Sequence, residues 1–168
     1  MKRGSSTLIF VAFLAVAGVF VLSTSSALPA RVASHFGASG QANSFMSRDG
    51  YVAFMLVFVV GLPLVMTGFM ALVFRSDSAS MNLPNRDYWV APERRAQLVA
   101  LLTAHGMRFG AGLVVFLSYV HWLVVRANTQ RPPQLDNDLM YAGLALFLLA
   151  TVLWIVWLWL TLRRAQTR

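Results

Sequence analysis

The sequence predicts an all-α integral membrane protein with four transmembrane helices and both termini in the cytoplasm. Hydrophobic residues make up 58% of the 168 residues and charged residues only 12%, about half the charged share of a typical soluble domain. The apolar residues gather in four long runs, and every acidic residue lies in a connection between runs. A soluble fold of this size cannot bury so much apolar surface, so lipid is the expected solvent.

The first apolar run extends from Thr7 to Ser23 and continues through small residues to Leu28. At about 1.5 Å per residue it reaches about 33 Å, enough to cross a hydrocarbon core of about 30 Å. The alternative is a cleaved signal peptide, because Lys2 and Arg3 precede the run and small residues follow it. We favour a retained helix, because the run exceeds the about 7–15 apolar residues of a signal peptide.

Three further runs complete the set, at 51–74, 107–125 and 140–162. The first of them contains no charge, and Pro63 within it removes one backbone hydrogen bond and is expected to bend the helix. The helical pattern of the run at 107–125 already begins at Pro92. Its first part is therefore expected to lie along or below the cytoplasmic interface.

The distribution of Lys and Arg sets the predicted orientation. Both tails and the second connection together hold nine of these residues, whereas the first and third connections hold four. Because basic residues accumulate on the cytoplasmic side, both termini are predicted to be cytoplasmic. The chain is thus predicted to be a multi-pass membrane protein.

Several functional classes find no support in the sequence. The net charge is +8, but no block of five basic residues suggests nucleic-acid binding. The chain has no cysteine, which excludes disulfides and zinc–thiolate sites. His35, His121, Asp136 and Asp138 lack the tight spacing of a metal motif, and no catalytic motif is present. We therefore expect no enzyme activity, no cofactor and no metal.

A polar pair and a glycine pair occur near the start of the third run. His105 and Arg108 are one helical turn apart, and Arg108 is the only charge inside an apolar run. Arg108 either snorkels to anionic headgroups or makes a buried functional contact. Gly106 and Gly110 form a small-xxx-small pair that lets another helix approach closely. In the connection before this run, Tyr88 and Trp89 are expected to be interfacial anchors or a docking surface for a regulator.

The loop at residues 28–48 is expected to be a compact polar turn. Pro29 ends the first helix, and its glycines permit tight backbone paths. Ser47 can cap the second helix, and Arg48 can reach phosphate headgroups. His35 and Phe36 are expected to pack the loop onto the helix ends.

The loop resembles the domain of unknown function DUF1648. The resemblance rests on the order of its residues between two apolar helices, L-P-x-x-V-A-x-H-F-x-x-x-G followed by S-R. That domain forms the amino-terminal part of SdpI-type bacterial immunity proteins. The matching residues are Leu28, Pro29, His35, Phe36, Gly40, Ser47 and Arg48. Three positions depart from the family pattern: Gly37 replaces Asn or Asp, Asn43 replaces an acid, and Arg48 replaces lysine. The resemblance covers about residues 5–75, and six helices are typical of the full immunity proteins.

We expect three units: a DUF1648-like helix-loop-helix membrane unit at 1–75, a cytoplasmic connection at 76–98 and a second transmembrane helix pair at 99–168, to which the resemblance does not extend. The resemblance implies a non-enzymatic, SdpI-like, multi-pass protein of a bacterial inner membrane that gives immunity to, or senses, a membrane-active peptide. The expected partners are the lipid bilayer, a peptide or protein, and other subunits in a homo- or hetero-oligomer. The candidate contacts are Pro29, Arg31, His35, Phe36, Gly40 and Arg48, although His35 can equally be a structural hydrogen-bonding residue.

Two other functions remain open. The chain can be an accessory or assembly subunit of a larger membrane complex that uses the Gly106/Gly110 face. A transporter or membrane enzyme would instead place His105 and Arg108 in a polar cavity.

Overall fold

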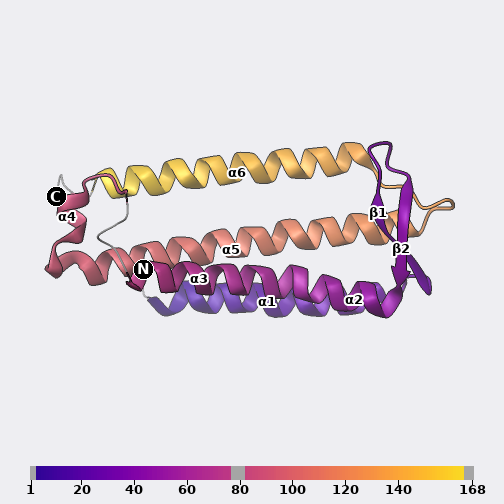
Figure 1. The fold of residues 1–168 in the computed structure, drawn as a ribbon, viewed down its shortest axis with the longest axis horizontal. Helices are drawn as coiled ribbons and strands as arrows, with labels where there is room; N and C mark the ends of the chain where they lie inside the picture. The colour runs from indigo at the N-terminus through magenta and orange to yellow at the C-terminus, as the bar shows by residue number, and fades with distance from the viewer. Residues whose placement is uncertain (1–2, 77–81, 165–168) are drawn as a thin grey trace.

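The computed structural model describes residues 3–76 and 82–164, which form a bundle of long helices with a small sheet at one end (Figure 1). The long helices are α1 (Arg3–Ser25), the continuous rod of α2 (Arg48–Leu56), η1 (Val57–Gly61) and α3 (Leu62–Ser76), α5 (Pro92–Asn128) and α6 (Asn137–Arg164). Because α1 begins and α6 ends at the same end of the bundle, we call it the termini end and the other the hairpin end.

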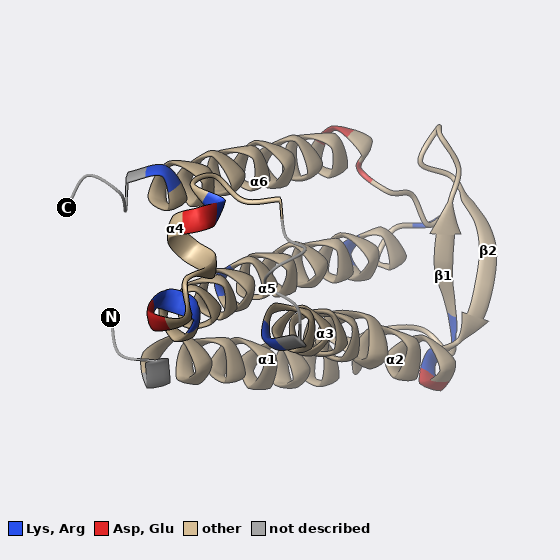
Figure 2. Ribbon diagram, turned by 60° about the vertical axis from the view of Figure 1, so that its left-hand side comes forward, with Lys and Arg blue, Asp and Glu red and all other residues tan. Residues whose placement is uncertain are grey.

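Length and composition make 4 of these helices able to cross a membrane, which indicates a multi-pass membrane protein. Each of the four predicted runs lies within one of them, so this part of the prediction is confirmed. Figure 2 shows that charged residues gather at the two ends of the bundle and are sparse between them. Lys2 and Arg168, which contributed to the predicted orientation, lie outside the described residues.

The second span contains a π-helical turn directly before its proline. Pro63 has no N–H to donate to the carbonyl four residues earlier, so a regular α-helix would leave that carbonyl unpaired. The turn at η1 widens the spacing, and the N–H of Leu62 donates to the carbonyl of Val57. This adjustment lets the rod continue across the proline, as π-bulges do in other helices.

Helix α5 occupies the centre of the bundle. The main hydrophobic core joins it to α1, β1, α2 and η1, and its buried residues are Phe10, Leu14, Ala17, Val21, Leu28, Val32, Tyr51, Met55, Val59, Ala111, Val114, Leu117 and Val124. Gly110 lies so close to α3 and α1 that a Cβ there would be 2.5 Å from Thr67 Cγ2 and 2.9 Å from Phe10 Cε2. Gly106 faces Met70 of α3. The chain's own helices therefore fill the Gly106/Gly110 face.

A second cluster fixes the termini end of α6. The short helix α4 (Arg86–Val90) buries Trp89 against Leu98, Leu102 and Leu162. Trp89 Nε1 donates to the carbonyl of Leu162 at 2.9 Å, and Asn85 Nδ2 donates to the carbonyl of Arg163 at 2.8 Å. These side chains satisfy two carbonyls that the last turn of α6 leaves without helical partners.

The structure corrects one expectation about this connection. Trp89 is only 1% exposed, so it is a core residue and not an exposed interfacial anchor. The first turns of α5 run in line with the rest of that helix and extend beyond the start of α1 (Figure 1), so α5 is one continuous helix from Pro92.

The loop between α1 and α2 is a β-hairpin, which the all-α prediction missed. Strand β1 (Arg31–Phe36) pairs with β2 (Ala42–Ser47) in an antiparallel sheet of 2 strands. The register shifts between Ala33 and His35 and again before Phe36, so the pairing includes irregular steps. This irregularity leaves no clean alternation of apolar and polar residues, which is the usual sequence sign of a strand.

A buried histidine joins three helices just below the hairpin. His121 of α5 is fully buried, and its ring nitrogens lie 2.8 Å from Thr24 Oγ1 of α1 and 2.9 Å from Tyr51 Oη of α2. The Thr24 hydroxyl donates to the carbonyl of Phe20 at 2.7 Å, so its oxygen accepts the Nε2–H of His121. Nδ1 then accepts the Tyr51 hydroxyl proton. Every polar atom of this His121 junction is thereby paired.

Replacing His121 with Leu is expected to lower the free energy of unfolding by about 1–3 kcal/mol, because the buried Tyr51 hydroxyl loses its acceptor. The double variant His121→Leu, Tyr51→Phe should recover part of this loss, because it leaves no orphaned hydroxyl. Thermal unfolding in detergent micelles, followed by circular dichroism, measures both effects.

His35→Ala is the matched control, because His35 is exposed and bonds only within the hairpin. A His121→Leu protein as stable as the His35→Ala protein would contradict the role given to the junction.

Candidate functional site

The hairpin lies across the hairpin end of the bundle and is attached to it through β1. The Asn128 side chain accepts from Ala33 N at 2.8 Å and donates to Ala33 O at 3.0 Å. It also donates to the carbonyl of Val124, one turn earlier in its own helix, at 2.9 Å. A single amide at the end of α5 therefore takes the place of a third strand along the free edge of β1.

The tip of the hairpin is bound to the connection between α5 and α6. The N–H of Leu135 donates to the carbonyl of Gly40 at 2.8 Å, and Gln41 forms an isolated bridge with Gln134. Gly40 has φ 80°, and a Cβ there would lie 2.5 Å from Leu135 O. Only glycine meets both conditions without strain. The hairpin is thus held at its middle and at its tip.

The other edge of the hairpin, along β2, faces away from the helices (Figure 2). Ala33 pairs with Phe45, and both backbone groups of Ala33 point away from β2 toward Asn128. In an antiparallel pair of this kind, the N–H and C=O of the opposite residue also point outward. Phe45 therefore presents its backbone groups on the outer edge of β2, where no bond to them is seen among the described residues.

Aromatic and cationic side chains accompany this edge. The Phe45 side chain is 43% exposed, although it belongs to a strand. The guanidinium of Arg31 lies 5.8 Å from the centre of its ring, within the range of a cation–π contact. We call Phe45, Arg31 and the outward backbone of β2 the β2 edge site.

The predicted contact residues have different positions in the hairpin. His35 is exposed, and its Nδ1–H donates to Asn43 Oδ1 at 2.7 Å. Phe36 packs against the main core, so only Phe36 of this pair fastens the loop to the helices. Arg48 donates to the carbonyl of Leu28 at 3.3 Å, and Pro29 is exposed in the link before β1.

The predicted cap of the second helix is confirmed, because Ser47 Oγ accepts from the N–H of Gly50 at 3.2 Å. Arg48 begins this helix, so its carbonyl contact ties the start of α2 to the link that follows α1. The ends of the two helices beneath the hairpin are thereby joined.

His105 and Arg108 lie together in the first half of α5, against α6. The His105 ring is 4.6 Å from that of Trp157, and the Arg108 guanidinium is 5.2 Å from the same tryptophan ring. His105 is buried, and its Nδ1 has no hydrogen-bond partner among the described residues. The groove next to Arg108 is lined mainly by apolar side chains, so it offers little to a polar substrate.

The chemistry available at the β2 edge site is hydrogen bonding to an extended chain. Among the described residues, no group of three or more His, Cys, Asp or Glu side chains is close enough to hold a metal ion. Strand β2 instead offers a backbone donor and acceptor and the ring of Phe45, and Arg31 of the neighbouring strand β1 adds a cation.

The sequence analysis did not predict Phe45 of the β2 edge site or Asn128, which holds β1 to α5. In the sequence, Phe45 is a single apolar residue in a polar loop. Nothing in the sequence shows that its backbone N–H and C=O would point away from β1. Asn128 had a weak signal, because it is an amide at the end of an apolar run where a side chain can bond to a neighbouring backbone.

Replacing Asn128 with Leu is expected to free β1, because both hydrogen bonds to Ala33 are lost. Exchange of the Ala33 amide hydrogen should become at least about tenfold faster, since a loss of about 1.4 kcal/mol in local stability has this effect. Hydrogen exchange in micelles, read by NMR, measures this rate. Thr129→Ala is the control, because that hydroxyl bonds only to Arg126 O within the same turn. Equal rates in the two variants would show that Asn128 does not hold the strand.

Comparison with protein families gives a match to the amino-terminal part of the chain. Residues 8–67 match the family model of the domain of unknown function DUF1648. The matched segment comprises most of α1, the whole hairpin and the rod from α2 into α3. Neither the search of curated proteins nor the search of solved structures gave a significant match. The resemblance predicted from the loop residues is therefore confirmed, because the amino-terminal part of the chain matches the DUF1648 model.

Proposed function

We propose that this protein binds a membrane-active peptide at the β2 edge site and thereby gives immunity to the peptide or senses it. It acts without catalysing a reaction, as an SdpI-like protein of a bacterial inner membrane. Both termini are cytoplasmic in this proposal, so the hairpin lies on the outer side of the membrane. The excess of Lys and Arg in the tails and the second connection supports this orientation.

The observation that carries the proposal is the unoccupied edge of a firmly attached strand. Exposed strand edges pair readily with other extended chains, and proteins usually cover or interrupt them. Here Asn128 covers the edge of β1, whereas Phe45 on β2 has its backbone groups directed outward. A peptide that adds as a third strand gains main-chain hydrogen bonds with little loss of order in the hairpin.

The side chains of the site favour a peptide with particular features. Arg31 provides a positive charge, and Phe45 provides an exposed ring beside it. The bound strand is expected to carry a carboxylate, from Asp, Glu or its own carboxyl terminus, opposite Arg31. Its apolar residues would cover Phe45.

The position of the site also fits a peptide that acts on membranes. The hairpin crosses the ends of helices that are able to span a bilayer, so its strands lie near headgroup level. A peptide gathered at the lipid interface would meet the β2 edge before it inserts.

The test is protection of a sensitive bacterial host against a panel of membrane-active peptides. Expression of the wild-type chain should raise the inhibitory concentration of at least one peptide. Phe45→Pro should abolish this protection, because proline removes the outward N–H while the neighbouring residues still pair with β1. Arg31→Gln should weaken protection about fivefold, as expected for one interfacial charge of about 1 kcal/mol.

Phe45→Thr is the matched control, because it keeps the outward N–H and a residue suited to a strand. It should retain more protection than Phe45→Pro at equal protein level in the membrane fraction. Full protection by the proline variant, or no protection by the wild type against any peptide, would refute the proposal.

A further inference from the structure

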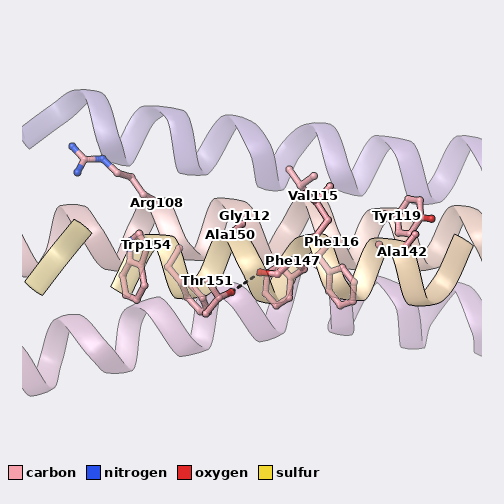
Figure 3. A pocket seen from close by; sticks show the side chains of 13 residues that line it. Arg108, Gly112, Val115, Phe116, Tyr119, Ala142, Phe147, Ala150, Thr151 and Trp154 are labelled. Atoms are coloured by element: carbon pink, nitrogen blue, oxygen red, sulfur yellow. Dashed lines mark hydrogen bonds between the residues drawn. The ribbon is translucent and has the colours of Figure 1, made fainter. Parts of the chain in front are cut away.

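A long apolar groove runs between α5 and α6. Its volume is about 630 Å³, and its walls include Gly112, Val115, Phe116, Phe147, Ala150 and Thr151. Figure 3 shows Arg108 and Trp154 toward one end and Tyr119 at the other. The Thr151 hydroxyl donates to Phe147 O at 2.8 Å, which leaves that hydroxyl turned back on its own helix.

The groove is open along its middle because α6 is fixed near its ends. At the termini end, Trp89 and Asn85 bind its last carbonyls. Toward the hairpin end, Tyr119 Oη donates to Leu139 O at 2.7 Å. Between these points Gly112 has no atom within 4 Å of the position its Cβ would take. Space therefore remains beside a stacked contact of Phe116 and Phe147, whose ring centres are 4.5 Å apart.

Polar groups collect at the termini end of the groove. The Arg108 side chain contributes to the wall, and its guanidinium points out of the groove at this end (Figure 3). Trp154 Nε1 and His105 Nδ1 are buried nearby, and neither has a hydrogen-bond partner among the described residues. The groove thus has an apolar length and a cationic end.

The depth of Arg108 matches the edge of the hydrocarbon layer. Its neighbour Met107 accepts a hydrogen bond on Sδ from Thr7 Oγ1 at 3.4 Å, and Thr7 begins the apolar run of α1. From Arg108 to Tyr119 the groove follows α5 for about 16 Å, at about 1.5 Å per residue. This is about half of a hydrocarbon core of about 30 Å, which is the depth of one leaflet.

We infer that the groove holds one acyl chain of an anionic phospholipid from the leaflet at the termini end, with the phosphate at Arg108. Charge complementarity at one end and the length of a single leaflet together favour a lipid over a partner helix. A spanning helix from another protein would need a surface about twice as long. Basic residues at this depth commonly bind lipid phosphate groups.

The experiment titrates the full-length protein in detergent with phosphatidylglycerol or phosphatidylcholine carrying 16:0 and 18:1 chains, and counts bound lipids by native mass spectrometry. The wild type should bind one phosphatidylglycerol more tightly than any phosphatidylcholine. Gly112→Trp should weaken this binding at least about tenfold by filling the groove. Arg108→Gln should weaken phosphatidylglycerol binding about fivefold and leave phosphatidylcholine binding within about twofold.

Gly68→Trp is the matched control, because Gly68 is also an exposed helix glycine with nothing within 4 Å of its Cβ position. It lies on α3, away from the groove, and should bind phosphatidylglycerol as the wild type does. Circular dichroism checks that each variant is folded. If Arg108→Gln is unfolded, the two tryptophan variants decide the test.

Three results would overturn the inference. Gly112→Trp could bind phosphatidylglycerol as tightly as the wild type, or Gly68→Trp could lose as much binding. A wild-type dimer that binds no lipid, and that Gly112→Trp converts to a monomer, would show that a second copy covers the groove.

Discussion

The bonding of His121 is the interaction on which the hairpin end of this protein depends. A polar atom buried between helices has no water to bind, so leaving it unpaired is costly. His121 avoids this cost by bonding to a hydroxyl of α1 and to a hydroxyl of α2 at once. The three helices are thereby joined at one level. The end of α1 that precedes the hairpin and the start of α2 that follows it are fixed in relation to α5. The Asn128 clamp two turns further along α5 then has β1 within its reach.

Helix α5 links the two ends of the molecule. It carries His121 and Asn128 toward one end and packs its closest glycine, Gly110, against α1 and α3 nearer the other. Helix α6 has no comparable packing, since the most apolar stretch of this span has no buried residue. Helix α6 is held mainly by hydrogen bonds to backbone carbonyls near its ends, so it differs from the other long helices in how it is attached. The elements from α1 to α5 pack closely together, whereas an open groove lies between α5 and the middle of α6.

The helices were predictable because their signal is simple. Long runs of apolar residues with charges only at their ends have few other solutions in a chain of this length. The resemblance of the loop also located the DUF1648 domain, because Pro29, His35 and Gly40 keep their order and spacing. Gly40 shows why the pattern includes a glycine, since its positive φ and its contact with Leu135 exclude any side chain.

The remaining features depend on partners far away in the sequence. Strand β1 is stabilised by Asn128, which lies 95 residues later, and its irregular register hides the alternation that marks a strand. Trp89 resembled an interfacial anchor because nothing local shows that it packs against Leu162. The groove beside Gly112 depends on where α6 is fastened, which composition and periodicity do not determine.

The departure at Asn43 changes the electrostatics of the hairpin. The family pattern places an acid at this position, where it would form an ion pair with His35 when the imidazole is charged. Asn43 keeps the hydrogen bond to His35 Nδ1 but removes the negative charge. Between Arg31 and Arg48 the chain has no Asp or Glu, so both strands carry only positive or neutral side chains. Under the proposed function, a partner strand at the β2 edge would meet a cationic surface, and Asn43 together with Arg31 would favour a negatively charged strand.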